Sequence, residues 1–131
     1  MTEQQVRAFL AGAAPEEIRA AVVGAGVDLV LDTVFAGLAD RFAPDDGRRA
    51  GRLRFVLTDG DDRHVRALDV GPTGARVGPA GEPRATITVG LVAFLQLGVG
   101  AADARRLLMR RRLAVSGDLL WAAVVVRALR P

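Results

Sequence analysis

The feature that most constrains this chain is a change in the period of its hydrophobic pattern. Over residues 27–42 the apolar side chains recur at helical spacing and share one face. Residues 52–58 instead alternate, with Leu53, Phe55 and Leu57 separated by arginine or other residues, and residues 84–89 alternate again. A period that changes from 3.6 to 2 between helical segments predicts a sheet covered by helices.

Turn and capping residues predict the order of the elements. We expect helices over 2–12, from Pro15 with interruptions at Gly24 and Gly26, over 27–42, over 90–100, over 103–109, and after Asp118, which caps the closing helix. We expect strands over 52–58, 63–70, 75–77, 84–89 and 112–117, of which the first four form a meander. This order predicts an α+β fold with about five strands in a twisted, mostly antiparallel sheet and helices on one face. Residues 1–131 form one domain, with 1–26 as an N-terminal helical extension.

The composition argues against catalysis. The chain has 131 residues, no cysteine and a single histidine, His64, which excludes disulfides, thiolate sites and multi-histidine metal sites. Ser116 lacks the Gly-x-Ser-x-Gly setting of a serine nucleophile. Asp59 and its acidic neighbours are explained by a hairpin turn. We therefore expect neither an enzyme nor a metal or cofactor site.

The charge is modest in total but unevenly distributed. The net charge is +3, with three arginines and eight acidic residues in 1–46, and fifteen arginines and seven acidic residues in 47–131. The two halves can attract each other within one chain, or between two copies in a homodimer. The arginines at 105, 106 and 110–112 lack the interleaved aromatic residues of a nucleic-acid site. They fit an anionic membrane contact or a solvated helix end, and the sequence leaves both interpretations open.

The hydrophobic content is high for a chain of this length, at 50%. The longest apolar runs are interrupted at Asp28, Asp32 and Gln96, so neither predicts a membrane span. The absence of a secretory pattern favours a cytoplasmic protein. Every basic side chain apart from the histidine is an arginine, which is typical of a GC-rich genome.

Two segments carry a resemblance to a known family. The stretch "TITVGLVAFLQLGVG", followed by "LLMRRRLAVSGDLLWAAVVVRAL", resembles the sterol-carrier-protein (nonspecific lipid-transfer) family, of the stand-alone bacterial type. Leu113, Val115, Gly117 and Asp118 match that family in order and spacing, and the resemblance extends over residues 27–130. It implies an apolar tunnel between the sheet and the helices. The implied function is non-catalytic binding or carriage of an elongated hydrophobic ligand, such as a fatty acyl chain, an acyl-CoA, an isoprenoid or a polyketide-like molecule.

The resemblance also suggests which residues contact the ligand. The expected tunnel lining consists of Phe35, Leu38, Phe42, Phe55, Phe94, Leu97, Leu108, Met109, Leu120, Trp121 and Val124. We expect Arg110, Arg111 and Arg112 to contact an anionic headgroup or membrane. Arg111 stands where the family favours glycine, so a positive φ there would cost stability. The alternative function is an accessory or scaffold protein that acts through protein contacts in hydrophobic natural-product biosynthesis.

Overall fold

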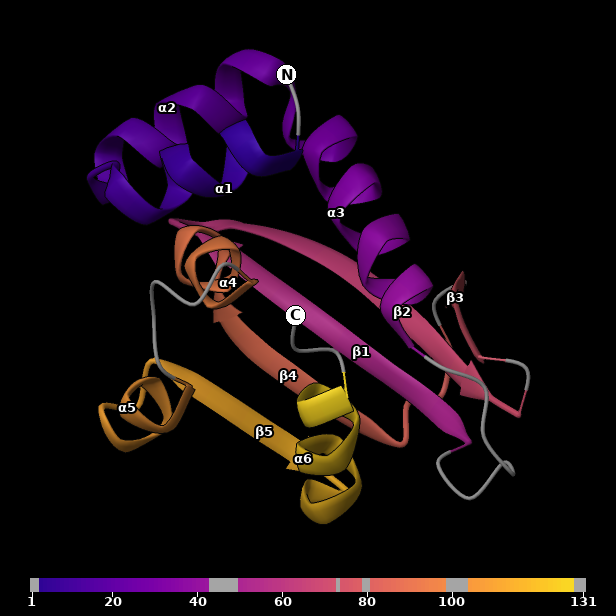
Figure 1. Cartoon of the computed structure of the whole chain (residues 1–131). Coiled ribbons are helices and arrows are strands. Elements are labelled where there is room, and N and C mark those ends of the chain that lie inside the picture. Colours follow the sequence, from indigo (N-terminus) through magenta and orange to yellow (C-terminus); the bar gives the residue numbers. More distant parts are fainter. Residues whose placement is uncertain (1–2, 43–49, 73, 79–80, 99–103, 129–131) are drawn as a thin grey trace.

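The structure, a computed structural model, describes residues 3–42, 50–72, 74–78, 81–98 and 104–128 (Figure 1). The helices are α1 (Glu3–Gly12), α2 (Pro15–Ala25), α3 (Val27–Arg41), α4 (Leu91–Gly98), α5 (Ala104–Met109) and α6 (Leu119–Ala128). The strands are β1 (Gly51–Asp59), β2 (Asp62–Gly71), β3 (Gly74–Gly78), β4 (Ala85–Gly90) and β5 (Leu113–Gly117). The expected order of helices and strands is confirmed along the described residues.

The strands form one sheet in the order β3-β2-β1-β4-β5. Three neighbouring pairs are antiparallel, and β1 and β4 are parallel, so the predicted α+β fold with a mostly antiparallel sheet is confirmed. The expected four-stranded meander is wrong in its last step, because β4 returns to lie beside β1. β4 is therefore an interior strand, paired with β1 on one edge and with β5 on the other.

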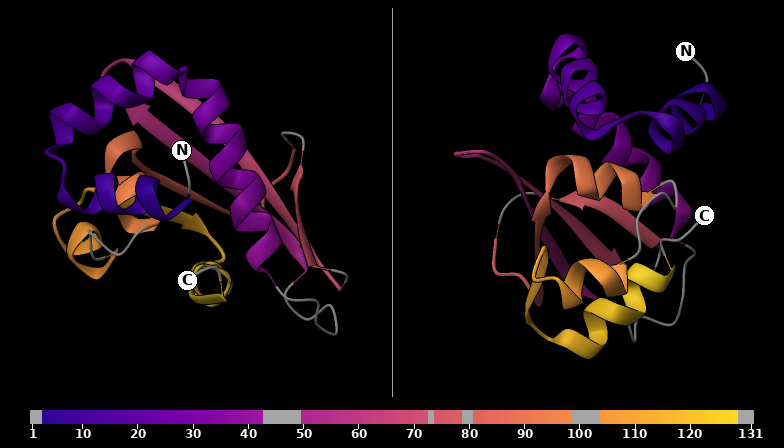
Figure 2. Two further views of the ribbon diagram at one scale, coloured as in Figure 1. Left: turned by 45° about the horizontal axis from the view of Figure 1, so that its top comes forward. Right: turned by 90° about the vertical axis from the view of Figure 1, so that its left-hand side faces the viewer.

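The helices cover one face of the sheet, as two further views show (Figure 2). Along β1 the covered face carries Leu53, Phe55 and Leu57, all at most 4% exposed. The intervening Arg52 and Arg54 are half-buried and lie on the opposite, uncovered face. The alternation in the sequence therefore fixes which face of the sheet receives the helices.

The junction between α2 and α3 lies at Gly26. The φ of this residue is +97°, which a side chain would disfavour, and the helix axes bend by 101° there. Gly24, by contrast, remains inside α2, so the expected interruption at that residue is wrong. Within the described residues, no single helix is both long enough and apolar enough to cross a bilayer; only the bent pair α2 and α3, taken together, meets that length and composition.

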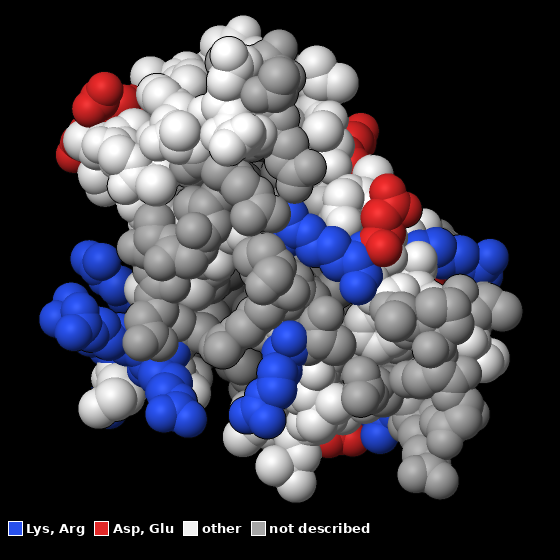
Figure 3. All heavy atoms as spheres, viewed as in Figure 1, with Lys and Arg blue, Asp and Glu red and all other residues white. Residues whose placement is uncertain are grey.

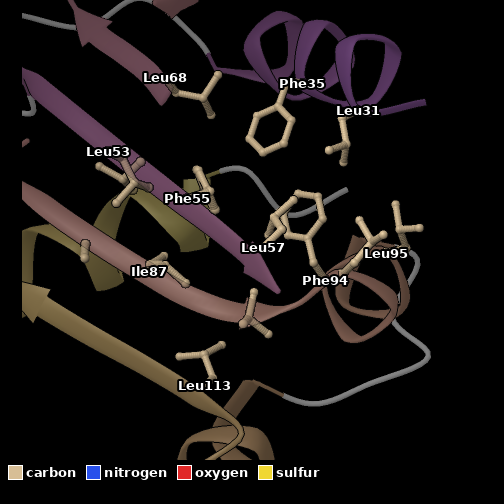
Figure 4. Packing of buried hydrophobic residues seen from close by; sticks show 14 of the residues in the cluster. Leu31, Phe35, Leu53, Phe55, Leu57, Leu68, Ile87, Phe94, Leu95 and Leu113 are labelled. Carbon is tan, nitrogen blue, oxygen red and sulfur yellow. The ribbon is translucent and has the colours of Figure 1, made fainter. Parts of the chain in front are cut away.

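The core lies between the helices and the covered face of the sheet (Figure 4). Its centre is built from Phe35 of α3, Phe55 of β1 and Phe94 of α4. Ile18 and Val22 of α2 are 0% and 6% exposed and belong to the same cluster. The second N-terminal helix thus contributes directly to the core.

An ion-pair network joins the acidic first part of the chain to the sheet. Arg66 on β2 donates to Asp28 at 2.9 Å, and its Nε lies 3.4 Å from Asp32; both carboxylates belong to α3. The Arg66 side chain is only 20% exposed. Attraction between the two halves of one chain is therefore realised here, while the homodimer remains a prediction.

Candidate functional site

The interior where the tunnel is expected is filled by aromatic rings. The rings of Phe35 and Phe94 stack at 5.2 Å between centroids, with 8° between their planes. Phe55 meets both edge-on, at 5.1 Å and 5.6 Å. Such pairs favour these geometries because the ring faces are negative and the edges positive. A ligand placed between these three rings would have to displace them.

The expected lining residues fall into three groups. The structure buries Phe35, Phe42, Phe55, Phe94 and Trp121 to 8% exposure or less. It half-buries Leu38 and Leu97, which pack against the core cluster. It leaves Leu108, Met109, Leu120 and Val124 between 45% and 83% exposed. Only the first two groups lie where an enclosed ligand would contact them in this conformation.

The spacing along α6 explains the exposed group. Trp121, Ala122 and Val125 face the sheet and are at most 5% exposed. Leu120 and Val124 are one residue before Trp121 and Val125, so they turn about 100° away from the core. An apolar helix read from its sequence alone does not reveal which of its faces is covered.

A group of three residues attaches α6 to the sheet; we call Arg84, Asp118 and Trp121 the latch. Arg84 precedes β4, and its Nη2 lies 3.0 Å from an Asp118 carboxylate oxygen. The same guanidinium lies over the Trp121 ring, 4.9 Å from the centroid, and donates to the Ala50 carbonyl at 2.9 Å. Gly51 makes room for this stack, because a Cβ there would lie 2.8 Å from both Arg84 and Trp121.

Asp118 also starts α6, as the sequence predicts. Its carboxylate accepts the backbone N–H of Trp121 at 3.1 Å, and its own backbone N–H donates to the Arg84 carbonyl at 3.0 Å. The hydrogen bond from the Trp121 backbone, followed by the hydrogen bond and charge of Arg84, lowers the pKa of the Asp118 carboxyl; partial burial opposes that shift. The charged form of Asp118 is therefore the one that holds α6.

Gly117 explains the Gly-Asp pair that precedes α6. Its φ is +88°, and a Cβ at this position would lie 2.6 Å from the Arg84 carbonyl oxygen and 3.0 Å from the Ala85 Cα. Only glycine lets β5 approach the start of β4 this closely and then turn into the helix.

The arginine turn between α5 and β5 ends the helix in a Schellman motif. The Arg112 N–H donates to the Leu107 carbonyl at 2.7 Å, and the Arg111 N–H donates to the Leu108 carbonyl at 3.1 Å. Arg111 has a φ of +57° and is the one non-glycine residue with positive φ in the part of the chain that the structure describes. The motif favours glycine at this position, so the predicted strain at Arg111 is present.

Among the described residues, no three histidine or acidic side chains gather in a way that could hold a metal ion. A hollow of about 730 Å³ lies on the uncovered face of the sheet, lined by Arg54, Thr86, Ser116 and Glu82 among others. It is wide open and polar, unlike the apolar tunnel that the resemblance implies.

The role of Arg84 in attaching α6 is not visible in the sequence. Nothing in the local pattern distinguishes this residue from the other arginines, so it is expected only as the polar start of a strand. Its partner Asp118 is 34 residues away. Glycines provide the only useful signal: Gly51 and Gly117 both have positive φ and both lie against Arg84.

Comparison with solved structures identifies the same architecture in sterol carrier proteins and within larger enzymes. Sterol carrier protein 2 from Yarrowia lipolytica (apo form) is 24% identical, with a TM-score of 0.57 over 73% of this chain and 86% of that chain. Palmitated SCP2L2 from Aedes aegypti is 18% identical, with a TM-score of 0.58 over 76% of this chain and 90% of that chain. The MycE methyltransferase from the mycinamycin biosynthetic pathway is 17% identical, with a TM-score of 0.69 over 98% of this chain but 37% of that chain.

No curated protein matches this chain significantly. The model of the SCP-2 sterol transfer family matches residues 47–130, which include every strand and the latch. The chain therefore belongs to the SCP-2 sterol transfer family.

Proposed function

We propose that this protein binds and carries an elongated hydrophobic ligand, such as a fatty acyl chain, an acyl-CoA, an isoprenoid or a polyketide-like molecule, without transforming it. The observation that carries the proposal is the SCP-2 family match, which spans the sheet together with α4, α5 and α6. The wholly apolar contact between Phe35, Phe55 and Phe94 supports it. Carriage needs no catalytic group, only a dry interior that can accept a chain.

The ligand enters by local opening of α6. The latch holds the first turn of this helix. Its ion pair joins Arg84 and Asp118, whose side chains are each about 40% exposed. Partly exposed ion pairs contribute little to stability, so this attachment is weak compared with the packed sheet. Displacing α6 uncovers the apolar interior beneath Trp121 and Val125 without breaking any strand pairing.

Native mass spectrometry tests the proposal. The purified protein is expected to retain a co-purifying lipid, or to bind one added fatty acid per chain after delipidation. A protein that binds no acyl chain, isoprenoid or polyketide at micromolar concentration would contradict it. Trp121 is the sole tryptophan, so its fluorescence reports directly on the environment of α6 during such a titration.

The second candidate is an accessory protein for the biosynthesis of a hydrophobic natural product. One crystal form of the MycE methyltransferase supports it, because the likeness spans 98% of this chain and so includes α1 and α2. A second crystal form of that enzyme spans 73% of this chain, and the two SCP2 structures span 73% and 76%. Deleting residues 1–26 removes Ile18 and Val22 from the core and is expected to destabilise the domain. A more direct test asks whether the whole chain co-purifies with biosynthetic enzymes encoded nearby. The lipid content of the same preparation is measured alongside.

A further inference from the structure

Among the described residues, exposed large apolar side chains are concentrated on α5 and α6, the two helices that flank β5, and exposed arginines lie on and directly after α5. Half of the large apolar side chains that the structure describes as exposed belong to α5 and α6: Leu108, Met109, Leu119, Leu120 and Val124. Met109 and Leu120 are 83% and 81% exposed, more than any of the others. We call these residues, together with Arg106, Arg110, Arg111 and Arg112, the α5–α6 surface.

The arginines of this surface are available to an external partner. Arg106, Arg110, Arg111 and Arg112 are all exposed, and none of these four makes an ion pair with a described residue. Between Arg105 and Gly117 the sequence contains no acidic residue. Figure 3 shows the basic side chains gathered where Figure 1 draws α5, with α6 at the same lower edge of the molecule.

We propose that the α5–α6 surface docks on an anionic lipid bilayer, with Met109 and Leu120 inserted and the arginines at the phosphates; its link to ligand delivery rests on the proposed function. Apolar side chains that stay exposed to water have an unfavourable hydration free energy. Insertion into the boundary between lipid headgroups and acyl chains removes them from water. Charge complementarity favours anionic lipid, because each arginine near an anionic surface adds to binding. Met109 and Arg110 are neighbours in the chain, so an apolar side chain that inserts lies next to a cationic side chain that binds a headgroup.

The Schellman turn explains how this arrangement is maintained. The positive φ of Arg111 ends α5 directly after Met109, so the turn holds Met109 and Arg110 outside the core while Leu107 and Leu113, at 8% and 9% exposure, pack inside. On the other side of β5, α6 presents Leu120 beside the latch. Docking therefore places the helix that opens against the source or the acceptor of the ligand.

Vesicle flotation tests the docking. The probe is phosphatidylcholine vesicles with and without phosphatidylglycerol, at low and at high salt. We expect the parent protein to float with the anionic vesicles and to be released by salt, because the Debye length shrinks to about 3 Å at 1 M. The triple variant Arg110→Gln, Arg111→Gln, Arg112→Gln should bind at least about tenfold more weakly. The double variant Met109→Ser, Leu120→Ser should also lose binding, at unchanged charge.

Two control variants distinguish docking at this surface from a general effect of positive charge or of exposed apolar side chains. Arg63→Gln with Arg76→Gln removes exposed arginines from β2 and β3, and Leu29→Ser removes a side chain that is 66% exposed on α3. Both are expected to bind vesicles like the parent. Equal binding to neutral and anionic vesicles, or α5–α6 variants that bind like the parent, would overturn the inference. So would salt-sensitive self-association, lost in the triple variant, without vesicle binding, because it makes this surface an interface between copies.

Experiments can contradict the docking and the proposed carriage of a ligand independently of each other. A protein that docks on vesicles but binds no acyl chain after delipidation contradicts carriage and supports docking. A protein that binds a soluble acyl ligand but never the anionic vesicles contradicts docking and leaves carriage standing.

Discussion

The guanidinium of Arg84 lies over the indole ring of Trp121, 4.9 Å from its centroid, while the same group pairs with Asp118 at 3.0 Å. A cation over an aromatic face and an ion pair at a helix start are each modest in strength. Together they fix the first turn of α6 against the end of the sheet. The attachment of the first turn of this helix therefore depends on three side chains and two glycines, Gly51 and Gly117.

Replacing Arg84 by glutamine is expected to loosen α6 without unfolding the sheet. The change removes both the cation over Trp121 and the ion pair with Asp118, so the amides of α6 should exchange about fivefold faster. Hydrogen exchange followed by mass spectrometry measures this. Arg63→Gln, on the exposed end of β2, should leave α6 unchanged. A uniform increase across all elements would show that Arg84 acts on global stability instead.

Acid is expected to release the latch before the core. The pKa of Asp118 is lowered in the folded state, so its contribution to stability is fully present above the ordinary carboxyl value of 3.8 and is lost as the pH falls below it. Trp121 fluorescence should therefore change below about pH 4. Asp118→Asn keeps a capping side chain but cannot titrate, and should abolish that transition. If the variant shows the same acid transition, another carboxylate controls α6.

Replacing Arg111 by glycine is expected to stabilise the domain. The φ of +57° costs a side-chain-bearing residue on the order of 1 kcal/mol relative to glycine. Urea unfolding followed by circular dichroism measures the gain. Arg110→Gly removes the neighbouring arginine where φ is not positive, so it should give no gain. A stabilisation of equal size in both variants would point to charge repulsion within the cluster rather than to backbone strain.

The sequence predicts the local elements well because their causes are local. The alternation around Leu53 and Phe55 and the cap at Asp118 are each visible within a few residues, and the structure has both. The special position of Arg111 is instead implied by the family resemblance, and its positive φ is present. The family resemblance is confirmed by the family model. These features need only the periodicity of the chain and the chemistry of its turns.

Long-range placement could not be predicted in the same way. Nothing local shows that β4 pairs with β1, or that Arg84 reaches Asp118 across 34 residues. The exposure of Met109 and Leu120 depends on which face of each short helix meets the sheet, and both helices are apolar enough to allow either face. The expected tunnel and its lining remain predictions that binding experiments have to test.

The last prediction concerns the interior itself. If the ligand occupies the space between the sheet and the helices, it replaces contacts that Phe94 makes with Phe35 and Phe55. Phe94→Ala removes a ring that is only 8% exposed, so the ligand-free protein should lose about 3–5 kcal/mol of unfolding free energy. A bound acyl chain fills the vacated space and restores part of that loss.

The measurable consequence is a larger rise in melting temperature on saturation with a fatty acid for Phe94→Ala than for the parent. Phe9→Ala is the matched control, because that ring lies on α1, is 40% exposed and does not contact the central rings. It should respond to the ligand like the parent. If Phe94→Ala is destabilised but gains no more from the fatty acid than the parent does, the ligand binds elsewhere. The aromatic centre is then an ordinary core that needs no displacement.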